Sequence, residues 1–166
     1  MAQVVTGNGE NFALLCVRID GRWQVDLLPE RFTEHVDTLV AVTHGQPDGA
    51  QAFVLANVGD DFFVAARRRG LDDLLLLSDV TAGAVDDLAQ QVCERLGVEI
   101  PSEDESDDDV QPAGDLDMFD DLGLDAAELG MVLSDIDAYA DEQLLTIARE
   151  LGFDDALSRV VEVPAR

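Results

Sequence analysis

The alternation of apolar runs and turn residues predicts β-hairpins in the first part of the chain. Two apolar runs, 12–19 and 23–27, lie on either side of residues 20–22, which include a glycine. Two further runs, 52–56 and 62–66, are separated by a second glycine-containing turn. Because short apolar runs around such a turn are typical of antiparallel pairs, we predict two hairpins.

A further strand and two helices complete this part. Four leucines at 74–77 could begin a buried helix, but turn residues on both sides and the short run favour a strand. One helix is predicted to begin at Pro29 and end by Gly45, and another to extend from Val80 to Gly97. The apolar stripe of the latter comprises Ala84, Val85, Leu88, Val92, Cys93 and Leu96. The order ββαβββα predicts an α+β fold, with an antiparallel-rich sheet covered by two helices.

The composition changes near residue 101. Residues 101–114 include the run Ser-Glu-Asp-Glu-Ser-Asp-Asp-Asp, whose dense like charge resists compaction, so we predict an acidic flexible linker. Beyond it, apolar residues recur at helical spacing and predict three or four short helices. We therefore expect an α+β domain over 1–100 and a small helical domain over 115–166.

Aspartate and glycine positions predict where these short helices begin and end. A first helical stretch is expected to end at Gly123, and the next to follow Asp125. Asp141 is the expected N-cap of a helix that ends at Gly152. Asp154 is the expected N-cap of a last helix.

The charge of the chain limits its partners. Its 166 residues include 36 acidic and 10 basic side chains, all ten of them arginine, for a formal net charge of -26. Such a surface repels phosphate backbones and anionic lipid, so we predict no direct binding to nucleic acid or membranes. A basic protein partner fits this charge, although solubility alone explains it equally well. Residues 1–10 lack the features of a signal peptide, which indicates the cytoplasm.

The inventory of reactive side chains does not point to catalysis. His35 and His44 are expected at the first helix in structural roles, and Cys16 and Cys93 as reduced core thiols. The aspartates between 115 and 125 do not follow the spacing of a calcium-binding loop. The sequence contains no phosphate-binding loop, dinucleotide fingerprint or nucleophile elbow. We predict no catalytic residue, no metal and no cofactor.

The basic residues are concentrated in one cluster, Arg67-Arg68-Arg69, at the end of a predicted hairpin. Such a cluster could bind an anion. In a chain of this charge, we instead expect these arginines to pair with the chain's own carboxylates or to lie on a solvated turn.

Short motifs along most of the chain carry a family resemblance. They are Trp23 with Val25-Asp26-Leu27, Asp60-Asp61-Phe62-Phe63-Val64, Leu76-Leu77-Ser78-Asp79, Pro112-Ala113-Gly114-Asp115, Asp121-Leu122-Gly123-Leu124, and Tyr139-Ala140-Asp141-Glu142 with Ile147-Ala148-Arg149-Glu150-Leu151-Gly152-Phe153. Together, between Phe12 and Val161, they resemble the bacterial family of tRNA adenosine deaminase-associated proteins, known mainly from actinobacteria. The resemblance implies a small acidic cytoplasmic protein associated with the deaminase that converts adenosine to inosine at the tRNA wobble position.

The chain does not carry the zinc signature of the deaminase itself. That signature is H-x-E followed later by P-C-x-x-C, whereas Asp37, not glutamate, lies two positions after His35, and Cys16 and Cys93 stand alone. The chain is therefore not the deaminase.

The leading hypothesis is a non-catalytic accessory protein that binds a basic partner, and the resemblance implies the tRNA-editing deaminase as that partner. The predicted contact surface consists of acidic residues in the helical part: Asp120, Asp121, Asp125, Glu128, Asp135 and Asp137. An alternative is an immunity-type protein that neutralises a cationic nuclease toxin. A third hypothesis is an enzyme that uses Asp or Glu pairs with a bound metal. The sequence leaves the oligomeric state open.

Overall fold

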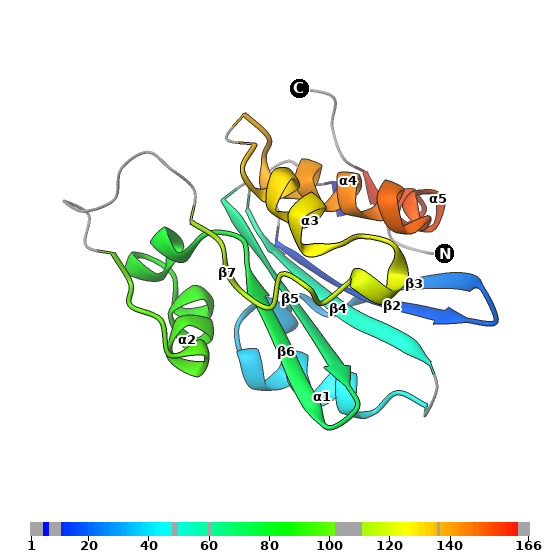
Figure 1. Cartoon of the computed structure of the whole chain (residues 1–166), viewed down its shortest axis with the longest axis horizontal. Helices are drawn as coiled ribbons and strands as arrows, with labels where there is room; N and C mark the ends of the chain where they lie inside the picture. Colours follow the sequence, from blue (N-terminus) through cyan, green and yellow to red (C-terminus); the bar gives the residue numbers. More distant parts are fainter. Residues whose placement is uncertain are drawn as a thin grey trace.

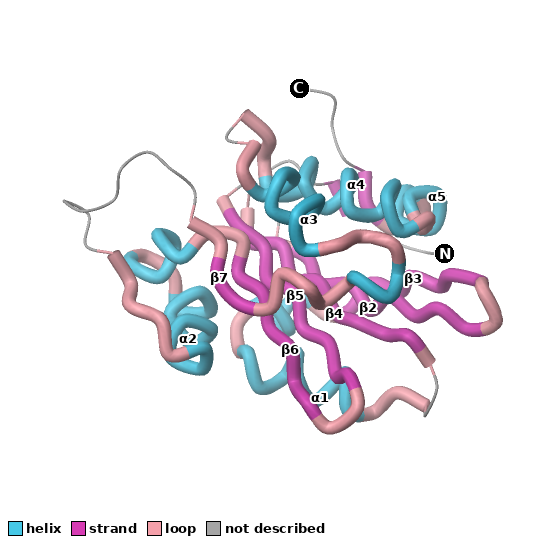
Figure 2. The backbone as a smooth tube through the Cα atoms, in the orientation of Figure 1, coloured by secondary structure: helices cyan, strands magenta, loops and turns pink. Residues whose placement is uncertain are grey.

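The fold is built on a six-stranded antiparallel sheet (Figures 1 and 2). The computed structural model describes residues 5–6, 11–47, 50–59, 61–101, 111–135 and 137–162. The strands of the sheet are β2 (Phe12–Ile19), β3 (Arg22–Leu28), β4 (Gln51–Val58), β5 (Phe62–Arg69), β6 (Asp72–Leu77) and β7 (Ala113–Gly114). They lie in the order β3-β2-β4-β5-β6-β7. A separate parallel pair joins β1 (Val5–Thr6) to β8 (Val161–Glu162).

The register of the strands follows the predicted hairpins. In the first hairpin, Cys16 lies opposite Val25, and Asp20 and Gly21 complete the turn with positive φ angles of 53° and 77°. On its other edge, β2 pairs with β4, so that Cys16 also lies opposite Phe53. The leucine run forms β6 and pairs with β5, which confirms a strand rather than a helix.

Both faces of the sheet are apolar, because β2, β4 and β5 are nearly continuous apolar runs. Alternate residues of a strand point to opposite faces. In β4, Phe53 and Leu55 belong to one hydrophobic cluster, and Val54 and Ala56 belong to another. Each face therefore needs its own layer of helices to exclude water.

One face is covered by α1 (Val36–His44) and α2 (Asp87–Leu96), which follow the 3-10 turns η1 (Glu30–Thr33) and η2 (Val80–Ala84). Helix α2 begins at the N-cap Asp86, whose carboxylate accepts hydrogen bonds from the amides of Leu88 and Ala89. It ends at Gly97, which has a positive φ of 72°. The buried sides of both helices pack on the even-numbered positions of β4.

The other face is covered by α3 (Ala126–Leu133), α4 (Ala140–Leu151) and α5 (Asp154–Ser158), which Figure 1 shows on the opposite side of the sheet from α1 and α2. Trp23 connects this layer to the first hairpin, because its ring contacts Phe53 and Phe153 at centroid distances of 5.7 and 5.0 Å. Its indole N–H donates to the carbonyl of Leu151 at 3.2 Å. We call these three helices the helical layer.

The α+β class predicted from the sequence is confirmed. The helical layer and the sheet contribute to one hydrophobic cluster, and the division into an α+β domain and a separate helical domain stays a prediction. Most of the predicted acidic linker, residues 102–110, lies outside the described residues. The end of that linker, Ala113–Gly114, forms a strand of the sheet.

Both helices predicted in the first part are shorter than expected. Each segment begins with a 3-10 turn, and the α-helix follows only after a break, at Val36 in one case and Asp87 in the other. The stripe predicted from Val80 is therefore interrupted. Val85 lies in the break and is 80% exposed, and Ala84 at the end of η2 is also exposed, so the assignment of both residues to the stripe is wrong.

Three predicted helix boundaries in the second part are also corrected. The stretch before Gly123 forms only turns and a short 3-10 helix, η3 (Asp120–Leu122). Helix α4 begins one residue before Asp141, after the N-cap Tyr139, and Asp141 is buried within its first turn. Asp154 is the first residue of α5 rather than its N-cap. The N-cap Asp125 and the left-handed Gly152 agree with the prediction.

We expect Gly114→Ala to destabilise the fold. Gly114 pairs with Leu76 at φ 109°, and a Cβ there would lie 2.1 Å from the backbone carbonyl oxygen of Leu75. The clash is with backbone, so relief requires displacing β7, at an expected cost of about 2 kcal/mol or more. Urea unfolding measures the loss.

The matched control is Gly130→Ala in α3. Apart from its chain neighbours and the backbone of its own helix, no atom lies within 4 Å of the added Cβ, and φ is not positive. We expect this variant to gain about 0.5 kcal/mol from helix propensity. Equal changes in the two variants would contradict the role assigned to Gly114.

Candidate functional site

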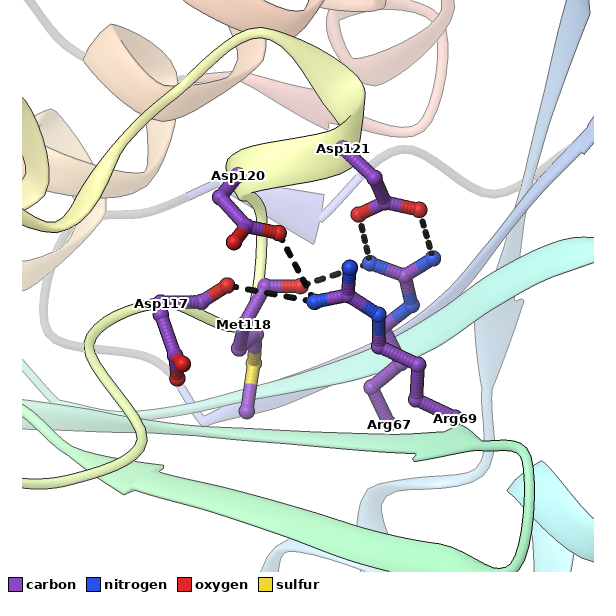
Figure 3. A network of polar contacts seen from close by, with 6 residues as sticks. All are labelled: Arg67, Arg69, Asp117, Met118, Asp120 and Asp121. Atoms are coloured by element: carbon purple, nitrogen blue, oxygen red, sulfur yellow. Dashed lines mark hydrogen bonds and ion pairs between the residues drawn. The ribbon is translucent and has the colours of Figure 1, made fainter.

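The arginines of β5 alternate between the two faces of the sheet. Arg67 points toward the helical side and is only 5% exposed. Its guanidinium donates to both carboxylate oxygens of Asp121 at 2.7 and 2.8 Å, and to the carbonyl of Met118 at 2.6 Å (Figure 3). This two-pronged geometry is the strong form of an arginine–carboxylate pair.

Arg69 makes a second, more exposed contact with the same segment. Its guanidinium donates to Asp120 at 2.7 Å, and both side chains are about 40% exposed. Figure 3 shows Arg67 and Arg69 side by side under η3, with Asp120 and Asp121 above them. The expectation that this basic cluster pairs with the chain's own carboxylates is therefore confirmed for two of its three arginines.

The electrostatics of Asp121 follow from this contact. The hydrogen bonds from Arg67 lower the pKa of the Asp121 carboxyl, with a smaller contribution from the charge of Arg69, and partial burial opposes the shift. Asp121 is therefore ionised at neutral pH and holds the segment before α3 against β5.

The six acidic residues predicted as a contact surface lie in different settings. Asp120 and Asp121 are already paired with arginines, and Asp125 caps α3 through the amide of Glu128. Asp135 accepts a hydrogen bond from the amide of Asp137. The structure places all six along η3, α3 and the turn before α4, and their role in partner binding stays a prediction.

The histidines and cysteines have structural settings. His44 contacts Asp73 at 2.6 Å, and His35 occupies the N-cap position of α1. Cys16 and Cys93 are free and buried, as predicted. Burial raises the pKa of both thiols, and the charge of Asp26 raises that of Cys16 further, so both are held as unreactive thiols.

A hollow of about 740 Å³ opens between the η1–α1 segment and the first half of α2. We call it the acidic groove, and its lining includes Glu30, Glu34, His35, Val85, Asp87 and Glu94. Sequence reasoning missed this groove, because its lining comes from four separate parts of the chain: residue 11, residues 30–35, residue 58 and residues 85–94. No local signal marked it, because Val85 fits the apolar stripe predicted from the sequence.

Two features are absent from the described part of the chain. Within it, no group of three or more His, Cys, Asp or Glu side chains is placed to hold a metal ion. No helix within the same residues is long and apolar enough to cross a membrane.

Comparison with known proteins identifies the family. The model of the Rv3753c-like tRNA adenosine deaminase-associated protein family matches residues 11–154. The chain belongs to this family. It is also similar to Protein Rv3753c of Mycobacterium tuberculosis (strain ATCC 25618 / H37Rv), with 40% identity over 154 residues that cover 92% of this chain and 88% of that protein. No solved structure matches the chain. The resemblance inferred from the short motifs is thus confirmed.

We expect Arg67→Met to lower the free energy of unfolding of this family member by about 2 kcal/mol. Methionine keeps much of the buried stem but leaves the Asp121 carboxylate and the Met118 carbonyl without their donor. Arg69→Met is the matched control, and we expect it to cost less than about 1 kcal/mol because its ion pair is exposed. Equal losses in urea unfolding would show that burial of the Arg67 pair contributes nothing.

The Asp121 pair also predicts a dependence on acid. The folded-state pKa of Asp121 lies below that of the unfolded chain, which is about 3.9. The pair therefore contributes stability that is present above the unfolded pKa and is lost as the pH falls through the folded pKa. We expect Asp121→Asn to be less stable than the wild type at pH 7, and the difference to shrink below about pH 4. Urea unfolding of both proteins across this range measures it, and a difference independent of pH would contradict the assignment.

Proposed function

We propose that this chain is a non-catalytic, cytoplasmic accessory protein that binds a basic face of a tRNA adenosine deaminase. Family membership carries the proposal, because the family is described as tRNA adenosine deaminase-associated. The net charge of -26 supports the basic character of the contacted face. The family match lends no support to the immunity-type alternative.

Charge supplies a physical reason for such an association. An enzyme that acts on tRNA needs a cationic surface to hold the phosphate backbone. An acidic protein is attracted to that surface over long range and docks there rapidly. Occupation of the surface would compete with RNA, so we propose that the accessory protein and tRNA exclude one another on the deaminase.

Two observations support a non-catalytic role. The raised thiol pKa values of Cys16 and Cys93 leave neither as a nucleophile at neutral pH. The histidine with a side-chain ion pair, His44, contacts Asp73 near the start of β6 rather than a serine, threonine or cysteine that it could activate. We therefore propose structural roles for Cys16, Cys93 and His44.

The acidic residues predicted from the sequence remain one candidate contact surface. Four of the six, Asp125, Glu128, Asp135 and Asp137, are exposed and have no arginine partner among the described residues. Asp120 and Asp121 contribute less, because Arg69 and Arg67 already neutralise them.

Calorimetric titration of the purified deaminase from the same organism with the full chain tests the proposal. We expect a complex whose Kd rises at least about tenfold between about 50 and 300 mM salt, because screening weakens contacts between exposed charges. Polyglutamate of similar net charge is the control and must bind more weakly at every salt concentration. Absence of a complex, or an affinity that salt does not change, would contradict the proposal.

A further inference from the structure

The acidic groove combines three features: it is hollow, it contains the exposed apolar side chain of Val85, and its carboxylates form no ion pair within the described residues. We propose that the groove is the docking surface for the basic partner. The occupant we infer is a protein segment that presents arginine or lysine side chains around one apolar residue. This inference rests on the proposed function and deepens it by naming the surface.

The walls of the groove are held at a fixed separation. The side chain of Gln91 on α2 accepts a hydrogen bond from the amide of Val36 at 3.0 Å and donates to the carbonyl of Glu34 at 3.2 Å. Both contacts are to backbone atoms, so they tie the start of α1 to α2 directly. The hollow is therefore formed before a partner arrives, which lowers the entropic cost of docking.

Val85 provides an apolar contact within this polar surface. It is 80% exposed and lines both the acidic groove and an adjoining hollow of about 390 Å³. The short break between η2 and α2 holds it out of the core, because the neighbouring carboxylate of Asp86 is engaged in capping α2. An exposed branched side chain between two hollows is suited to pack against an apolar residue of a partner.

The carboxylates of the groove lack cationic partners within the described part of the chain. The ion pairs found there use Asp37, Asp73, Asp120 and Asp121, none of which lines the groove. Glu30, Glu34, Asp87 and Glu94 therefore leave a local excess of negative charge. A partner that supplies ammonium or guanidinium groups relieves the repulsion between these carboxylates. Carboxylates that are already paired with arginine gain less from such a partner.

The spacing of these carboxylates favours separate side chains over a single ion. No three of them are close enough to share a metal. Long, flexible arginine and lysine side chains can reach carboxylates on both walls, whereas nucleic acid would bring further negative charge to the groove. The occupant that fits is a basic protein segment.

Two triple variants test the assignment by calorimetric titration of the deaminase. One removes three exposed groove charges through Glu34→Gln, Asp87→Asn and Glu94→Gln. The matched control removes three exposed charges from the helical layer and the turn before α4 through Glu128→Gln, Asp137→Asn and Glu150→Gln. Both variants change the net charge equally, and thermal unfolding confirms that both remain folded. We expect the groove variant to weaken binding about tenfold and the control less than about threefold.

The control set contains Glu128 and Asp137, so the same comparison decides between the groove and the surface predicted from the sequence. If the wild type binds the deaminase and both variants bind equally well, or the control binds more weakly, the groove assignment fails and the proposed function stands. If the wild type does not bind the deaminase, the proposed function fails.

A second probe tests the groove independently of the deaminase. A synthetic peptide with leucine between arginine pairs is titrated into the labelled full chain, and backbone amide resonances are followed by NMR. We expect the largest shifts at Val85, Asp87 and Gln91, and no shifts with a peptide in which glutamates replace the arginines. Shifts confined to the helical layer, or no shifts at all, would overturn the groove assignment.

Discussion

A β-sheet with apolar side chains on both faces can exist in water only if both faces are covered. Strand β4 imposes this constraint most strongly, because Phe53 and Leu55 point to one side and Val54 and Ala56 to the other, all fully buried. Helices α1 and α2 cover one face, and the helical layer covers the other (Figure 1). The C-terminal third of the chain is thereby required for burial of the sheet, as the contacts of Trp23 with Phe153 and Leu151 show.

The same constraint explains why arginines lie at the end of β5. Strand β5 continues beyond its apolar residues 62–66. The side chain of Arg67 therefore lies between the sheet and the segment that leads to α3. A buried guanidinium is tolerated only when its donors are satisfied. Asp121 and the carbonyl of Met118 satisfy them, and the pair fixes where the segment crosses the sheet. Some of the acidic side chains therefore stabilise the fold by pairing with arginines of the same chain.

Two surfaces of the described residues present carboxylates that a partner could contact. One surface consists of η3, the helical layer and the turns between them. Several of its carboxylates cap a helix, accept a hydrogen bond within a turn or pair with arginine. The acidic groove presents carboxylates around a preformed hollow that contains Val85. A deaminase-associated role is consistent with either surface, because both would attract the cationic face of an RNA-binding enzyme. The groove is favoured as the docking surface because it combines this charge with a preformed hollow and the exposed Val85.

The sequence by itself determined the local elements: the hairpins, the leucine strand, the N-cap Asp125, the helix ends at Gly97 and Gly152, and the α+β class. These follow from periodicity and turn chemistry, which act within a few residues. Tertiary structure alone decided the two-residue strand β7, the pairing of Arg67 with Asp121, and the joining of η1 and α2 into a groove. Each joins positions 36 to 57 residues apart, so no local pattern encodes it. The break between η2 and α2, which exposes Val85, was likewise decided by tertiary structure. The segment bends there so that α2 can pack on the sheet.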